Sequence, residues 1–261
     1  MYFEILGSKN PDAPTVVLSS GLGGSAHFWQ AQLPVLQSGY RVIVYDQNGT
    51  GRSPASLPSD YSIQSMADEL LALLDHTKIT HCHFIGHALG GLVGLNIALQ
   101  RPEILQSLVL INAWSSPNPH TLRCFRVRQS LLHNSPPEMY LQAQALFLYP
   151  PDWIMLNIQR LEQEEQHMLE HFPNQDNLLA RIKALSEFDI DSQLGAIKTD
   201  TLVVANKDDM LVPWQRSEIL ASGLVNVTLR VFDYGGHACT ITEPKIFNDL
   251  LLTHLSHYDA K

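Results

Sequence analysis

The sequence has little that suits a secreted, membrane-bound or nucleic-acid-binding protein. Its 261 residues include three cysteines, Cys82, Cys124 and Cys239, whose number and wide spacing fit neither a disulfide framework nor a zinc or redox motif. Lysine and arginine number 17 against 26 aspartates and glutamates, so no basic stripe can neutralise a nucleic acid or an anionic membrane. No apolar stretch reaches the ~20 residues of a membrane span, and residues 1–10 lack the pattern of a signal peptide. We therefore expect a cytoplasmic protein with free thiols.

What is present is typical of a folded globular chain. Hydrophobic residues make up 45% of the sequence and charged residues 16%, which argues against disorder. Short runs rich in β-branched residues read as buried strands. They are TVVLSS (15–20), RVIVYD (41–46), CHFIG (82–86), SLVLIN (107–112), DTLVVANKDD (200–209) and VTLRVFD (227–233).

Helical patterns alternate with these strands. They cover residues 62–77, 89–100, 215–221 and 243–257. Because strands that alternate with helices need crossover connections, the order predicts an α/β fold with a mainly parallel, doubly wound sheet.

The strand signal disappears between residues 116 and 190. This segment carries helical patterns separated by the proline pairs of SPPE and YPPD, which are typical of helix ends. We expect an α/β core formed by residues 1–115 and 191–261, with residues 116–190 inserted as a helical cap.

Glycine-rich or polar segments follow each predicted strand. They are SGLGGS (20–25), DQNGTGRS (46–53), GHALGG (86–91), NAW (112–114), NKDD (206–209) and GGHACT (235–240). Ligands of open parallel sheets bind outside the carboxyl ends of the strands, so these segments predict a site at that edge.

One of these segments has the frame of a nucleophile elbow without its nucleophile. In IGHALGG (85–91), Ala88 stands where a hydroxyl or thiol is required. A methyl group cannot attack a substrate, so the chain either has no catalytic activity or uses chemistry without a side-chain nucleophile.

The elbow and the order of polar segments resemble the α/β-hydrolase family, and this resemblance implies the remaining catalytic groups. His237 would be the catalytic histidine and Asp209 its acid, with Asp208 as the alternative. The backbone N–H groups of Leu22 and Leu89 would be the oxyanion donors.

A narrower resemblance extends over essentially the full length. GLGGS, YDQNGTG, GHALG, RCF, LFLYPPDW, NLL and YGGHAC together resemble the RutD hydrolases of the bacterial Rut pathway of uracil and pyrimidine degradation. Members of this family also carry alanine at the elbow. The resemblance implies hydrolysis of a small labile product of uracil breakdown, either carbamate or aminoacrylate, and implies no cofactor.

Further residues are candidates for the pocket, although each can equally be structural. The candidates are His87 beside the elbow, Asn112 and Trp114 at a strand end, and Arg126 in the cap. Arg126 and its neighbours Arg123 and Arg128 could offer a cation to a carboxylate substrate. His81 and His83 have no third ligand near them in sequence, so we expect no metal.

Without a nucleophile, the predicted site retains an acid-oriented histidine, two backbone donors and a cap that excludes water. Proton transfer by His237 and Asp209 on a labile nitrogen compound in a small closed pocket is therefore our main hypothesis. Two alternatives stay open: a non-catalytic protein that binds a small ligand, and an esterase with a displaced nucleophile at Ser19, Ser20 or Cys239.

Overall fold

A seven-stranded sheet forms the centre of the molecule. The computed structural model describes residues 1–10 and 12–259 of the chain. The strands are β1 (Phe3–Gly7), β2 (Thr15–Ser19), β3 (Arg41–Tyr45), β4 (Cys82–His87), β5 (Leu105–Ile111), β6 (Thr201–Asn206) and β7 (Val227–Phe232). Their order is β1-β3-β2-β4-β5-β6-β7. β1 is antiparallel to β3, and the other neighbouring pairs are parallel, which confirms the predicted fold class.

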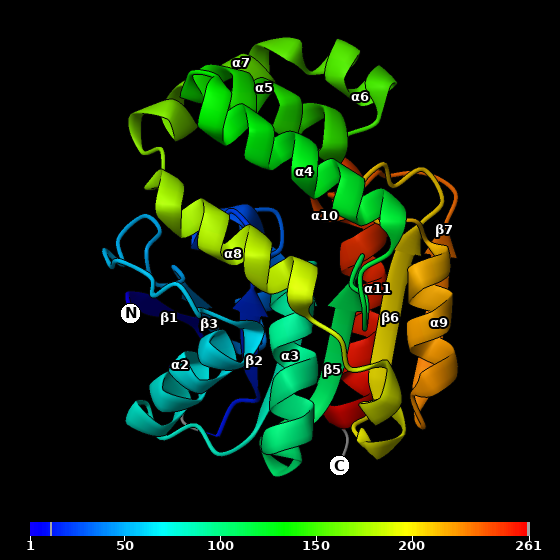
Figure 1. Cartoon of the computed structure of the whole chain (residues 1–261). Coiled ribbons are helices and arrows are strands. Elements are labelled where there is room, and N and C mark those ends of the chain that lie inside the picture. Colours follow the sequence, from blue (N-terminus) through cyan, green and yellow to red (C-terminus); the bar gives the residue numbers. More distant parts are fainter. Residues whose placement is uncertain (11, 260–261) are drawn as a thin grey trace.

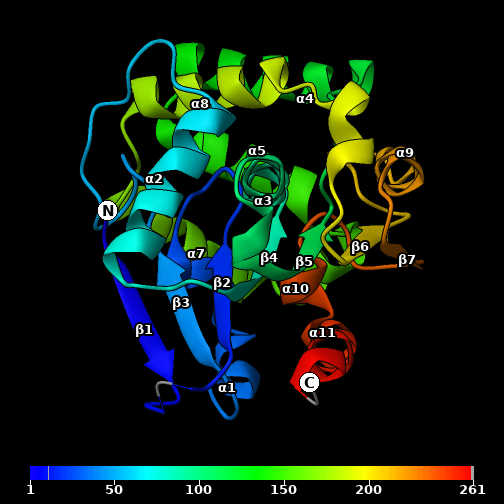
Figure 2. The same ribbon diagram turned by 90° about the horizontal axis from the view of Figure 1, so that it is seen from below.

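Helices cover both faces of this sheet (Figure 2). One face carries α2 (Ile63–His76), α3 (Leu89–Gln100) and α9 (Gln215–Gly223), and the other carries α1 (Leu33–Leu36) and α11 (Pro244–Asp259). Each face has its own apolar cluster. Short elements complete the core: η1 (Ala26–Trp29), η2 (Pro102–Ile104), η3 (Asp191–Ala196) and α10 (Cys239–Thr242).

The local sequence accounts for most of these elements. β2, β4 and β6 are buried along their whole length, as their continuous apolar runs require. α2 begins at a capping box formed by Ser62 and Ser65, and its apolar residues recur at helical spacing on the buried face. β1 was not predicted from the sequence, because this edge strand is half exposed and lacks a buried run.

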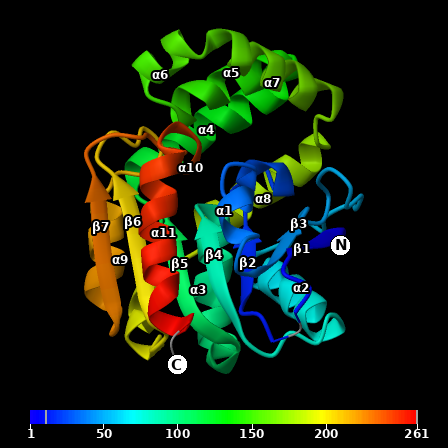
Figure 3. The same cartoon turned by 180° about the vertical axis from the view of Figure 1, so that it is seen from behind.

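Between β5 and β6 the chain forms a layer of helices above the carboxyl ends of the strands (Figures 1 and 3). They are α4 (Pro119–Asn134), α5 (Pro137–Leu148), α6 (Pro151–Leu156), α7 (Ile158–Glu170) and α8 (Gln175–Glu187). Prolines stand at the N-termini of α4, α5 and α6. We call α4 to α8 the cap.

Candidate active site

Ala88 occupies the sharp turn between β4 and α3. Its φ of 47° and ψ of −112° lie in a region that residues with side chains rarely adopt, at a cost of about 1–3 kcal/mol. The turn also needs glycine on both sides: a Cβ at Gly86 would lie 2.4 Å from the Gly90 carbonyl oxygen, and a Cβ at Gly90 would lie 2.1 Å from that of Ser19. The backbone of a nucleophile elbow is therefore present, and it carries an inert methyl group.

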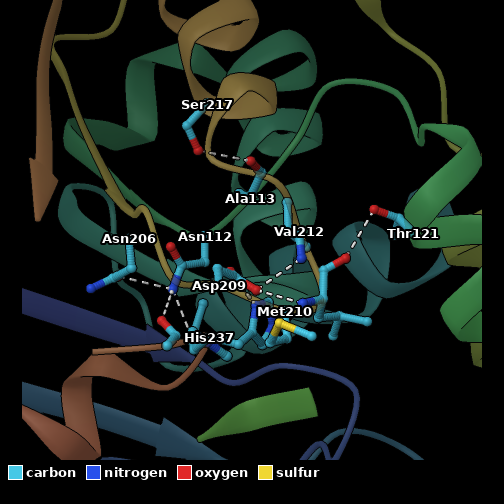
Figure 4. Close-up of polar contacts among 12 residues, drawn as sticks. Asn112, Ala113, Thr121, Asn206, Asp209, Met210, Val212, Ser217 and His237 are labelled. Carbon is cyan, nitrogen blue, oxygen red and sulfur yellow. Dashed lines mark hydrogen bonds and ion pairs between the residues drawn. The ribbon is translucent and has the colours of Figure 1, made fainter. Parts of the chain in front are cut away.

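His237 and Asp209 form a buried pair beneath the cap (Figure 4). The His237 Nδ1 atom lies 2.7 Å from Asp209 Oδ2, and the two side chains are 2% and 0% exposed. The other oxygen of Asp209 accepts hydrogen bonds from the backbone N–H groups of Leu211 and Val212, each at 2.8 Å. Because the carboxylate only accepts, Nδ1 carries the proton and Nε2 is left to exchange protons with a ligand.

Asp208 has a different task from its neighbour. Its two oxygens accept the backbone N–H groups of Gly235 and Gly236, at 3.1 and 2.9 Å. The carboxylate thus fixes the loop that leads into His237 and leaves the imidazole to Asp209.

Asn112 supports the same loop from the end of β5. Its Nδ2 atom donates to the His237 carbonyl oxygen at 2.7 Å, and its own backbone has a φ of 49° (Figure 4). The side chain is buried and bonded to protein groups, so it positions the histidine loop.

The N–H groups of Leu22 and Leu89 border the elbow. Leu89 is the first residue of α3, whose N-terminus carries positive partial charge, and Leu22 follows β2. Neither N–H donates to an acceptor within the part of the chain that the structure describes. A Cβ added to Gly21, beside Leu22, would lie 3.7 Å from the Ala88 methyl carbon, so the two segments meet at the elbow. The arrangement is suited to binding an oxyanion.

The loop that carries Leu22 is fastened to the end of β3. Asp46 accepts the Ala26 N–H at 2.9 Å, and the Gln47 N–H donates to the Gly24 carbonyl at 2.9 Å. Burial acts to raise the pKa of Asp46, but hydrogen bonds from the Arg52 side chain and from the Ala26 and Arg52 backbones hold it below its ordinary value. Asp46 is therefore an ionised structural group.

Comparison with known proteins identifies the family of the chain. Residues 14–146 match a family described as alpha/beta hydrolase fold. A protein of Stutzerimonas stutzeri (strain A1501), named "Putative carbamate hydrolase RutD", is 60% identical over 256 residues, which are 98% of this chain and 97% of the relative. The chain belongs to the RutD family. A Variovorax paradoxus (strain S110) protein of the same name is 51% identical over 261 residues, 100% of this chain and 97% of the relative.

Solved structures agree on the fold. The enol-lactonase of Burkholderia xenovorans LB400 superposes with a TM-score of 0.89 at 21% identity, covering 98% of this chain and 96% of that one. A hydrolase of Pseudomonas aeruginosa PA01 gives 0.87 at 26% identity, covering 97% and 93%. The RutD-family chain is thus a hydrolase built on the α/β-hydrolase fold. Within its described residues, no helix is long and apolar enough to cross a membrane.

In this RutD-family protein the cap is bonded directly to the loops of the pair. Thr121 Oγ1 donates to the Leu211 carbonyl at 3.0 Å, beside Asp209. On the other side, the Ala238 N–H donates to the Leu148 carbonyl at 3.1 Å, immediately after His237. The cap therefore contacts the two loops that carry Asp209 and His237.

A third attachment joins α8 to the core through Arg181, which sequence reasoning missed. This buried arginine donates to Thr50 Oγ1 and the Asn48 carbonyl oxygen, and one of its nitrogens lies 3.5 Å from the Leu22 carbonyl oxygen. Arg181 lies in the apolar stripe of α8 with Leu178, Ile182 and Leu185. A single cation in such a stripe is the sequence signal that could have identified it, because charged residues are rarely buried without partners.

The remaining candidates lie in different surroundings. His87 is buried beside His237, and Trp114 is buried with its ring 6.2 Å from that of Phe125. Arg126 is exposed on the outside of α4 and does not reach the pair, because its position falls on the outer face of that helix. Arg128, on the same helix, is buried, and it donates to Tyr140 Oη at 2.6 Å and to Gln144 Oε1 at 2.8 Å.

The alternative nucleophiles, Ser19, Ser20 and Cys239, are not paired with His237. Ser19 Oγ is bonded to Tyr45 Oη at 2.7 Å. Burial raises the pKa of Cys239 far above its ordinary value, which keeps it a thiol. Among the described residues, neither these two side chains nor Ser20 is hydrogen-bonded to His237. The residues that the structure describes contain no group of three His, Cys, Asp or Glu side chains that could hold a metal ion.

Proposed function

We propose that this RutD-family protein breaks down a small carbamate by proton transfer from His237, without a covalent intermediate. The observation that carries the proposal is the methyl group of Ala88 at an intact elbow beside a buried His237 and Asp209 pair. The relatives are named carbamate hydrolases, which supports the choice of substrate.

The size of the available catalytic effects suits a labile substrate. A general acid contributes roughly 10² to 10⁴ in rate, and an oxyanion donor about 3 kcal/mol. These effects are too small to open a stable ester or amide well, but they are large enough for a compound that already decomposes in water. Retention of the buried His237 and Asp209 pair favours catalysis over simple ligand binding, because the pair is suited to proton transfer.

In the proposed reaction the carboxylate of H₂N–COO⁻ accepts hydrogen bonds from the Leu22 and Leu89 N–H groups. Protonated His237 then gives its Nε2 proton to the substrate nitrogen. The C–N bond breaks with its electron pair moving to nitrogen, which yields ammonia and carbon dioxide. Asp209 stabilises the imidazolium before the transfer, and the neutral histidine regains a proton from water.

Aminoacrylate is the second substrate to be tested. A water molecule activated by neutral His237 would displace ammonia from aminoacrylate, which gives malonic semialdehyde. The proposal includes a role in uracil breakdown and a cytoplasmic location. The three free thiols, Cys82, Cys124 and Cys239, support the location.

Ammonia release from freshly generated carbamate and aminoacrylate, with and without protein, tests this function. We expect the protein to accelerate carbamate breakdown above the spontaneous rate. Faster breakdown of aminoacrylate alone would identify aminoacrylate as the substrate in place of carbamate. Saturable binding of both compounds without faster ammonia release would show that the protein binds a ligand without catalysis.

A further inference from the structure

His87 is held in one orientation beside the elbow. It is the last residue of β4, one position before Ala88. Its ring stacks on Phe28 with centroids 4.6 Å apart and meets the His237 ring edge-on at 4.8 Å. The Nε2 atom lies 2.8 Å from the His237 carbonyl oxygen, and these contacts leave the ring little freedom to turn.

These contacts also fix the tautomer of His87. A carbonyl oxygen only accepts, so Nε2 must carry the hydrogen, and a neutral ring then has a bare lone pair on Nδ1. Burial, with the nearby His237, lowers the pKa of His87 to about 3. The ring is therefore neutral at any working pH, and Nδ1 is a permanent acceptor.

This acceptor has no partner within residues 1–10 and 12–259. The Nδ1 atom is buried and unpaired, and the whole residue is 3% exposed. It lies over Gly21: a Cβ placed there would be 3.0 Å from Nδ1 and 3.7 Å from the Ala88 methyl carbon. Because Gly21 has no side chain, no Cβ covers Nδ1 where it borders the elbow.

We propose that Nδ1 of His87 accepts an N–H group of the substrate at this position and so selects nitrogen compounds over oxygen analogues. A ring lone pair attracts N–H donors and repels ester or carboxylate oxygens. The proposal rests on the proposed function, since the carbamate nitrogen must lie within reach of both Nδ1 of His87 and Nε2 of His237. Accepting one N–H there directs the nitrogen lone pair to the Nε2 proton of His237.

Nitrogen NMR of the whole protein with ¹⁵N-labelled histidine tests the contact without turnover. Acetamide and acetone serve as probes, because they differ only by an amino in place of a methyl group. We expect acetamide to shift the Nδ1 signal of His87 saturably and acetone to leave it unchanged. Equal shifts with both probes, or none with either, would overturn the proposal.

Two variants separate Nδ1 from Nε2 in the turnover of carbamate. In His87→Gln the amide nitrogen can replace Nε2, but no atom replaces Nδ1, whereas in His87→Asn the side-chain oxygen replaces Nδ1. We expect His87→Gln to lose roughly 10-fold or more in kcat/KM, mainly through a raised KM, and His87→Asn to retain more of the wild-type value. Equal losses, or the reverse order, would assign the effect to the Nε2 bond and contradict the proposal.

These experiments distinguish a failure of the proposed reaction from a failure of the proposed role of His87. An acetamide shift without any carbamate turnover keeps the binding role of His87 and removes the proposed reaction. Turnover that depends on His237, together with an Nδ1 signal indifferent to acetamide, removes the role of His87 alone.

Discussion

Replacing Ala88 by serine is expected to give the elbow the one group that it lacks. The backbone already has a φ of 47°, so serine adds no new strain, and its hydroxyl would face Nε2 of His237. A buried hydroxyl that finds this partner changes the free energy of unfolding by about 0.5–1.5 kcal/mol. The variant should therefore fold like the wild type.

The groups around residue 88 determine how much the acylation rate of the serine variant should increase. General-base help from His237 is worth roughly 10² to 10⁴ in rate, and each backbone donor, Leu22 and Leu89, about 3 kcal/mol. These terms suffice for acylation by an activated ester, whereas the site was not shaped for deacylation. We expect a burst of one product equivalent followed by slow turnover.

The assay is a p-nitrophenyl acetate burst followed by mass spectrometry of the intact protein. An acetyl adduct on the serine variant, absent from the wild type and from an Ala88→Ser, His237→Ala double variant, is the expected result. No adduct on a correctly folded serine variant would refute the alignment of elbow, base and donors, and would favour a ligand-binding protein.

Further predictions concern the pair, its loop, the cap and acid stability. Asp209→Asn should lower kcat by up to roughly 10² to 10⁴, the full contribution of proton transfer, because the imidazole loses its tautomer, whereas Asp208→Asn should act mainly on the thermal midpoint; equal kcat losses would contradict the two roles. Arg181→Met should cost about 2 kcal/mol of unfolding free energy, measured in urea, because the Asn48 carbonyl loses a buried donor, and no change would mean that α8 is held otherwise. Only the unfolded state protonates His87 between pH 6.5 and about 3, so acidification through this window should destabilise the wild type by up to about 1.4 kcal/mol per pH unit more than His87→Gln; parallel pH curves would disprove a buried neutral ring.

Much of the fold follows from the sequence because buried parallel strands need continuous apolar runs. β2, β4 and β6 are such runs, and they were recognised. β1 was missed because an edge strand with one exposed face needs no such run. Within the predicted helical segment 116–190, α6 and α7 are separate helices divided at Asn157, where no glycine or proline marks a break.

The site is less readable from sequence than the sheet. Adjacent carboxylates such as Asp208 and Asp209 differ only in the direction of their side chains, which the loop geometry decides. The burial of Arg128 and the exposure of Arg126 depend on which face of α4 meets α5, and spacing alone does not determine that face. Arg181 acts over more than a hundred residues of chain, on Thr50 and Asn48, and such contacts leave no local pattern.

The most direct test of the central claim is the rate of carbamate breakdown by the His237→Ala protein. We expect this variant to return the reaction to the spontaneous rate, while a His81→Ala control, altered at an exposed histidine outside the site, keeps the wild-type rate. A His237→Ala protein that still releases ammonia at the wild-type rate would contradict proton transfer by this residue.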